Sequence, residues 1–201
     1  MNNERHQLSS YLPEERVESI LEMLKVKKAV LKITRHRKSK FGDYRPPFKG
    51  APHTITINGS LNKYAFLLTF LHEFAHLQMF EIFKGRILPH GKEWKTAFSL
   101  LIFNELSLNT FPEPLLKSIK KYALNPKAST FSDPELFNAL RKFDLKQTDR
   151  VQLIDLDNNA QFVIGKKAFI RGELRRTRFL CEEKSTGKKY LVHKNAEVTP
   201  V

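Results

Sequence analysis

The chain has 201 residues, of which 41% are hydrophobic, so it is long enough to bury a core and lacks the composition of a disordered segment. No apolar run approaches the roughly 20 residues of a membrane-spanning helix, and the N-terminal residues lack a signal-peptide pattern. We therefore expect a cytoplasmic protein with no membrane partner. The net charge of +14 favours a polyanionic partner, nucleic acid ahead of an acidic membrane surface, although basic residues also serve solubility.

The first predicted element is a helix over about residues 13–25. Apolar residues recur there at helical spacing, and Glu14 and Glu15 lie in the first turn, where the helix dipole favours negative charge. A strand is predicted next, around Val30–Ile33, because apolar and polar side chains alternate there.

The most basic stretch of the chain runs from Lys25 to Lys49, with ten Lys or Arg residues and a single acid, Asp43. Phe41, Tyr44 and Phe48 are interspersed with these charges. Single-stranded nucleic acid is bound by such a mixture, in which cations contact phosphates and rings stack on bases. The same pattern also fits a solvated strand and loop whose aromatic residues belong to the core. The candidate nucleic-acid contacts here are Lys32, Arg35, Arg37, Lys38 and Lys40.

A second strand is predicted at His53–Asn58, where the residues alternate cleanly. Because it directly precedes a long helix, we expect it to be an edge strand that lines a substrate cleft, to which an extended peptide can pair. Ser60 or Asn62 is the expected cap of the helix, which is predicted over about 61–83.

That helix contains the pattern His72-Glu73-Phe-Ala-His76 within an apolar run. In a helix, His72 and His76 lie one turn apart on the same face, so their imidazoles can bind one zinc ion. Glu73 leans toward that face and can accept a proton from water held by the ion. A buried helix with hydrogen-bonded histidines is the alternative, but a charged glutamate in an apolar helix needs a partner, which a cation provides.

A catalytic zinc usually has three protein ligands and an open position. His90 is the favoured third ligand, since it opens the next predicted helix, which runs through Trp94 to about Leu106. Gly91 leaves room for a close backbone approach. Glu93 is the competing ligand.

The remaining sequence predicts short helices near 115–122 and 132–143, and then a change to alternating segments. The predicted strands are Val151–Asp155, Gln161–Ile164, Lys167–Ile170, Arg176–Glu182, Lys189–His193 and Glu197–Val198. Three arginines in this region are further candidate nucleic-acid contacts, namely Arg175, Arg176 and Arg178. The single cysteine, Cys181, excludes an internal disulfide and a cysteine-based zinc site, and we expect it to be a half-buried strand residue.

The combination of His72-Glu-x-x-His76 with His90-Gly-x-x-Trp94 resembles the SprT-like, or Spartan-like, metalloproteases. Phe41-Gly-x-Tyr44-Arg45 and the strand at 53–58 also fit this family, and the resemblance covers roughly Lys25 to Leu106. It implies that His72, His76 and His90 are the zinc ligands and that Glu73 is the general base.

The resemblance further implies an α+β fold, with a zincin-like metalloprotease core in which the metal helix packs beside a small sheet. The expected domains are a SprT-like protease domain at 1–125, a helical linker at 126–148 and a small all-β module at 149–201. Many relatives carry a four-cysteine zinc ribbon at that place, so this module would have to resemble a ribbon without metal.

The expected activity is that of a zinc-dependent metalloendopeptidase that cleaves proteins bound or crosslinked to DNA, in the context of DNA repair. Its partners would be a protein substrate and DNA, and its cofactor Zn²⁺. Arg45, Tyr44 and His53 are candidates for stabilising the oxyanion. Two other functions stay open: a non-proteolytic nucleic-acid-binding protein with a structural zinc, and a zinc hydrolase of small amides or peptides.

Overall fold

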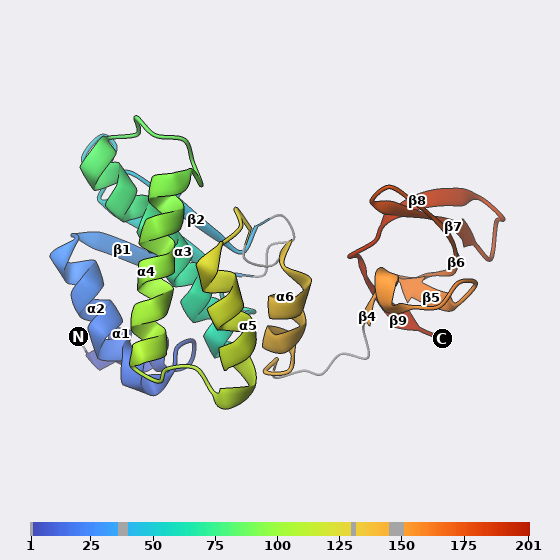
Figure 1. The fold of residues 1–201 in the computed structure, drawn as a ribbon, viewed down its shortest axis with the longest axis horizontal. Helices are drawn as coiled ribbons and strands as arrows, with labels where there is room; N and C mark the ends of the chain where they lie inside the picture. Colours follow the sequence, from blue (N-terminus) through green and yellow to red (C-terminus); the bar gives the residue numbers. More distant parts are fainter. Residues whose placement is uncertain (1, 36–39, 130–131, 145–150) are drawn as a thin grey trace. The chain divides into compact units, whose positions relative to one another are not determined.

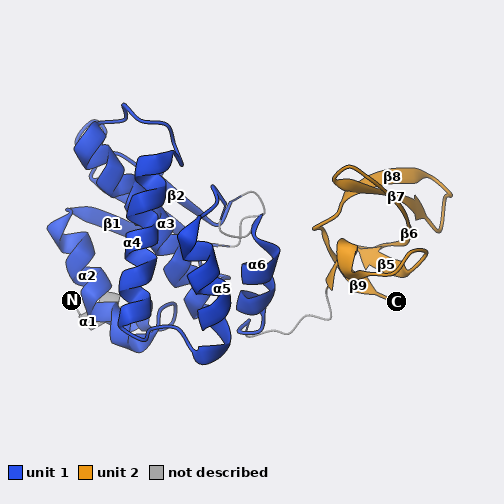
Figure 2. Cartoon of the chain, viewed as in Figure 1, with its two compact units in different colours: residues 1–145 blue, residues 146–201 orange. Residues whose placement is uncertain are grey.

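The structure is a computed structural model that describes residues 2–35, 40–129, 132–144 and 151–201. The chain forms two compact units, residues 1–145 and 146–201, which are coloured separately in Figure 2. The first contains all the α-helices and a small sheet, and the second consists of strands (Figure 1). The predicted α+β class is confirmed.

Unit 1 begins with helix α1 and a 3₁₀ turn, continues through an α2–β1–β2–β3 segment, and ends in four helices. Their bounds are α1 Asn2–Ser9, the 3₁₀ turn Glu14–Arg16, α2 Val17–Val26, β1 Ala29–Thr34, β2 Gly42–Arg45, β3 His53–Asn58, α3 Lys63–Phe83, α4 Lys92–Ser107, α5 Glu113–Leu124 and α6 Pro134–Arg141.

The sheet of unit 1 has the strand order β1–β3–β2. Strand β3 pairs in parallel with β1 and antiparallel with β2, so it lies in the middle of the sheet. The prediction that His53–Asn58 is an edge strand is therefore wrong. Alternation along one strand shows which side chains share a face, but not how many neighbours the backbone has. The edge strand on this side is β2.

Helix α3 runs through the centre of unit 1. Asn62 caps it, because its side-chain oxygen accepts a hydrogen bond from the Ala65 amide at 3.0 Å. Most residues from Ala65 to Ala75 are buried, on every side of the helix. This explains why the segment reads as an apolar run rather than an amphipathic one. The helix ends at Phe83, and Lys84 follows in the left-handed conformation with a φ of 50°.

The predicted linker at 126–148 is not a separate element in the structure, since its helix α6 packs within unit 1. Leu136 and Leu140 are buried in the core of that unit. The side-chain amide of Asn62 also donates to the Leu140 carbonyl at 2.9 Å and to the Asp144 carboxylate at 2.7 Å. The cap of the central helix is therefore tied directly to α6.

Unit 2 is a six-stranded antiparallel sheet in the order β4–β9–β5–β6–β7–β8. Its strands are β4 Val151–Gln152, β5 Gln161–Ile164, β6 Lys167–Arg175, β7 Arg178–Glu183, β8 Lys189–His193 and β9 Glu197–Pro200. Residues 153–155, predicted to continue the first strand, form a 3₁₀ turn instead. Phe162, Phe179 and Val198 form part of its own apolar core, in which Cys181 is completely buried rather than half-buried.

Among the described residues, no helix is long and apolar enough to cross a membrane.

Candidate metal centre

Three histidine side chains converge in unit 1. His72 and His76 come from neighbouring turns of α3, and His90 comes from the segment just before α4. Their Nε2 atoms form a triangle, with 3.3 Å between His72 and His76, 3.0 Å between His76 and His90, and 3.3 Å between His90 and His72. These three residues therefore lie close enough to bind one metal ion.

The size of this triangle fits a tetrahedral ion. Imidazole nitrogens bind zinc at about 2.0–2.1 Å, which places two ligands of a tetrahedral site about 3.3 Å apart. Two of the three observed separations equal that value and the third is slightly shorter. All three imidazoles turn the same nitrogen, Nε2, toward a common point. The donor set and its spacing thus fit a shared ion.

The environment keeps these imidazoles unprotonated. Burial, followed by repulsion from the other histidines, lowers the pKa of His72 to about 3, and similar effects lower that of His76 to about 4. Burial also lowers the pKa of His90. Because a metal ligand must present a lone pair, the site is ready to bind a cation at neutral pH without first losing protons.

The indole ring of Trp94 packs against all three imidazoles. It is fully buried, and its ring centroid lies 4.7 Å from that of His72, 5.1 Å from that of His76 and 4.6 Å from that of His90. The Nδ1 atom of His72 is buried and has no hydrogen-bond partner among the described residues. Packing against Trp94 and Phe98 therefore orients this ring, in place of the outer hydrogen bond that metal-binding histidines usually donate.

His90 reaches the other two histidines through an unusual backbone conformation. Its φ is 60°, in the left-handed region that residues other than glycine rarely adopt. Gly91 follows as the N-cap of α4, and a Cβ atom there would lie only 3.0 Å from the Leu88 carbonyl oxygen. Glu93, the competing ligand, is exposed on the first turn of α4 and is not part of the cluster.

Glu73 lies beside the cluster at the base of a cleft of about 380 Å³. Its side chain is 7% exposed, so water reaches it only through the cleft. The three histidines and Glu73 line this cleft together with residues from the β2 region, from α3 and from the segment after α5, namely Lys40, Phe41, Gly42, Asp43, Tyr44, Thr69, Ala128 and Ser129. Ala128 and Ser129 had no sequence signal, because they follow α5 and are distant from the motif.

Gly42 was missed as a site residue, although it belongs to the Phe41-Gly-x-Tyr44 motif. A Cβ atom at this position would lie 2.5 Å from the Oε1 atom of Glu73 and 2.7 Å from the Cγ2 atom of Thr69. Strand β2 can approach α3 this closely only because residue 42 has no side chain. The glycine therefore leaves the space that the Glu73 carboxylate occupies.

We expect Gly42→Ala to lower catalytic activity by roughly 10- to 100-fold, because the new methyl group displaces the Glu73 carboxylate and small misplacements of this kind have such effects. Bound metal per chain should be unchanged, since the atoms nearest to the new methyl group belong to Glu73 and Thr69 and not to the histidines. The measurement is kcat together with metal content by mass spectrometry. Thr54→Ala on the neighbouring strand is the matched control, and equal activity of both variants would contradict the role of Gly42.

Of the three residues considered for oxyanion stabilisation, Tyr44 is the one that lines the cleft. Its hydroxyl oxygen lies 2.8 Å from Nδ1 of His53, and burial, aided by Glu81, raises the pKa of Tyr44, so the phenol stays protonated. Arg45 is exposed, and its Nε donates to the Asp43 carboxylate at 3.0 Å. Asp43 also accepts a hydrogen bond from Lys40 at 2.6 Å, which partly neutralises that cation at the cleft.

The predicted nucleic-acid contacts fall in both units. Lys32 and Arg35 are exposed on and after β1, and Lys40 lies at the cleft. Arg37 and Lys38 lie outside the described residues.

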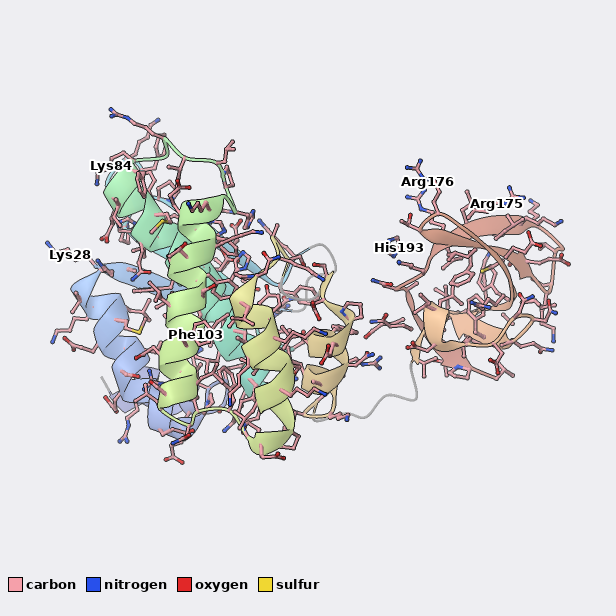
Figure 3. All side chains as sticks on the ribbon, viewed as in Figure 1. Lys28, Lys84, Phe103, Arg175, Arg176 and His193 are labelled. Atoms are coloured by element: carbon pink, nitrogen blue, oxygen red, sulfur yellow. The ribbon has the colours of Figure 1, made fainter. Side chains whose placement is uncertain are left out.

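In unit 2, the arginines gather at one end of the sheet. Arg175 pairs with Arg178 across β6 and β7, and Arg178 pairs with His193 across β7 and β8. Arg176 forms the turn between β6 and β7 with a φ of 56°. All four side chains are exposed, and Figure 3 shows Arg175, Arg176 and His193 along one side of this unit. In the described strands, no carboxylate lies directly opposite Arg175 or Arg178.

No family model matches the chain, and comparisons with curated proteins and with solved structures returned no match.

Proposed function

We propose that this protein is a zinc-dependent metallopeptidase with a zincin-like core similar to that of the SprT-like enzymes. The single observation that carries the proposal is the triangle of Nε2 atoms from His72, His76 and His90, next to the buried Glu73 in an open cleft. A structural metal site is usually closed by four protein ligands, whereas a catalytic site keeps a position for water and substrate. Three ligands beside a carboxylate in a cleft favour catalysis.

Zinc is the metal that this donor set favours, because three imidazoles form a site of moderate softness and harder cations prefer oxygen ligands. When bound, zinc would supply a Lewis acid that lowers the pKa of water and polarises a carbonyl group. The three histidines would hold the ion, and Trp94 packs against all three imidazoles.

The chain's own residues account for the proton transfers and for substrate position. Glu73 accepts a proton from water as the water oxygen attacks the peptide carbonyl carbon, and it then delivers a proton to the leaving amine nitrogen as the C–N bond breaks. Tyr44, protonated and in the cleft wall, is the proposed donor to the oxyanion. The edge strand β2, which lines the cleft, can pair with an extended substrate chain.

The basic residues support DNA-bound or DNA-crosslinked proteins as the substrates. Lys32 and Arg35 are exposed on and after β1, which is the edge strand opposite β2, and Arg175, Arg176 and Arg178 lie together on unit 2. Unit 2 would take the place of the zinc ribbon of related enzymes. Its apolar core includes Phe162, Phe169 and Cys181.

Metal analysis combined with a proteolysis assay tests the proposal. We expect one zinc per chain, cleavage of a DNA-binding protein such as a histone, and faster cleavage when single-stranded DNA is added. A chelator should stop cleavage, and added zinc should restore it. Raising the salt concentration should weaken DNA affinity steeply, because phosphate contacts release counterions.

The same assay distinguishes the other two functions. Zinc with DNA binding but no cleavage of any protein would favour a nucleic-acid-binding protein with a structural metal. Cleavage of short peptides that DNA and salt leave unchanged would favour a hydrolase of small amides. Absence of bound metal after exposure to zinc would reject the proposal altogether.

A further inference from the structure

A second hollow adjoins the candidate metal centre, on the other side of His90. It is a groove of about 620 Å³ between α4 and α5, which lie side by side in Figure 1. Three apolar side chains that line it are exposed to solvent: Leu100 at 65%, Phe103 at 41% and Leu124 at 77%. Phe103 is marked on α4 in Figure 3. Bulky apolar residues grouped in one groove indicate a binding surface more strongly than the same residues scattered singly.

Hydrogen bonds fix the two helices that form the groove against each other. The Ser99 hydroxyl donates to the Ala123 carbonyl at 2.6 Å, and the Lys95 ammonium donates to the Asn125 side-chain oxygen at 2.9 Å. Both bonds join α4 to the C-terminal end of α5. The groove therefore exists before anything binds, and a ligand need not separate the helices to enter it.

The groove adjoins the cleft of the candidate metal centre. His90 lines both, and Gly91 and Lys92 continue the groove lining toward the first turn of α4. A polypeptide whose scissile bond lies in the cleft can therefore extend past His90 and place its next residues between α4 and α5. The shared lining residue therefore favours the protein substrate as the occupant of the groove.

The lining also indicates the chemistry of that substrate segment. Lys92 and Lys95 contribute positive charge, and no acidic residue lines the groove within the described part of the chain. The apolar floor favours bulky side chains, which a phosphate backbone does not offer. A segment with large apolar residues next to a carboxylate is complementary to both features.

We infer that the α4–α5 groove is a substrate-selecting subsite of the proposed peptidase, which binds an apolar and acidic segment adjacent to the scissile bond. This inference rests on the proposed function, since it takes the cleft to be the place of cleavage. It goes beyond that function by assigning a preference to the enzyme and by naming Leu100 and Phe103 as the residues that set it.

A binding assay that needs no hydrolysis tests the inference. The full chain carrying Glu73→Gln is titrated with two fluorescein-labelled peptides of equal length. One contains adjacent Leu and Phe residues beside two Glu residues, and the other has Ser in place of Leu and Phe. We expect the apolar peptide to bind at least roughly tenfold more tightly, because each buried large side chain contributes enough for such a ratio.

The double substitution Leu100→Gln and Phe103→Gln should remove that tenfold preference. Ile82→Gln on α3 is the matched control, because Ile82 is equally exposed, at 65%, but lies outside the groove, and it should preserve the preference. Leu124→Gln, on the other helix, should weaken the preference as well. Unfolding midpoints of these variants should stay close to that of the parent, since each of the four apolar residues is at least 41% exposed.

Three results would overturn the inference. The first is equal affinity of the parent and the double variant for the apolar peptide. The second is a dimer in sedimentation that the double variant converts to a monomer, which would assign the groove to a second copy of the chain. The third is displacement of the peptide by single-stranded DNA together with loss of DNA binding in the double variant. A protein that binds the peptide as expected but cleaves nothing would instead reject the proposed function alone.

Discussion

Replacement of Glu73 by Gln is expected to lower peptide hydrolysis by roughly 10²- to 10⁴-fold, the usual contribution of a positioned general base. The amide has nearly the same shape as the carboxylate but cannot accept a proton from water. Metal content should stay at that of the parent, because Glu73 is not part of the histidine cluster. The measurement is kcat/KM on a protein substrate, with zinc per chain determined on the same preparation.

Glu81→Gln is the matched control for this variant. Glu81 lies on the same helix, but outside the residues that line the cleft, where it accepts a hydrogen bond from Lys27 at 2.6 Å. It should therefore keep the activity of the parent. Full activity of Glu73→Gln would falsify the assignment of the general base. Loss of both zinc and activity would show that Glu73 acts on the metal centre and not on the proton transfer.

His90→Ala is expected to weaken zinc binding by more than 100-fold. Outer-shell partners of metal ligands typically contribute 10- to 100-fold, and a direct ligand should contribute more. The vacated position also leaves the Nε2 atoms of His72 and His76 with only each other, at 3.3 Å. Activity at limiting zinc should fall with the same ratio. The measurement is a competition titration against a chelator of known affinity.

Two further variants make this result specific. His6→Ala removes an exposed histidine on α1 and should leave zinc affinity unchanged. Glu93→Gln removes the competing candidate ligand and should also leave it unchanged, because Glu93 is exposed and outside the cluster. If zinc affinity instead falls with Glu93→Gln and survives His90→Ala, the third ligand is Glu93.

Local sequence patterns were enough for the elements that carry the candidate site. The apolar run placed a helix over 61–83, and the structure has α3 at Lys63–Phe83. The spacing of His72 and His76 required only helical geometry to bring them together. Alternation in the C-terminal region placed strands that the structure contains as β5 to β9, although the strand predicted at Lys167–Ile170 extends to Arg175 and the next begins at Arg178 instead of Arg176. These features depend on neighbours within a few residues, which periodicity reports directly.

Features that depend on which elements pack together could not be derived in this way. The central position of β3 depends on its two pairing partners, and the inclusion of α6 in unit 1 depends on contacts with the distant Asn62. The packing of Trp94 against the histidines depends on how α4 lies against α3. The place of Trp94 in the His90-Gly-x-x-Trp94 motif was nevertheless a signal that it belongs to the site.

The sequence by itself predicted the candidate ligands, namely two histidines on one helix and His90 as the favoured third, with a carboxylate beside them. Only the tertiary structure decided between His90 and Glu93, since the left-handed backbone at His90 turns that ring toward α3 while Glu93 faces solvent. It also placed Gly42 against Glu73 and brought the α4–α5 groove next to the cleft, with His90 lining both. The physical reason is that the residue types and their local spacing set which chemical groups are available, whereas the distances between residues far apart in the chain are set only when the helices and strands pack.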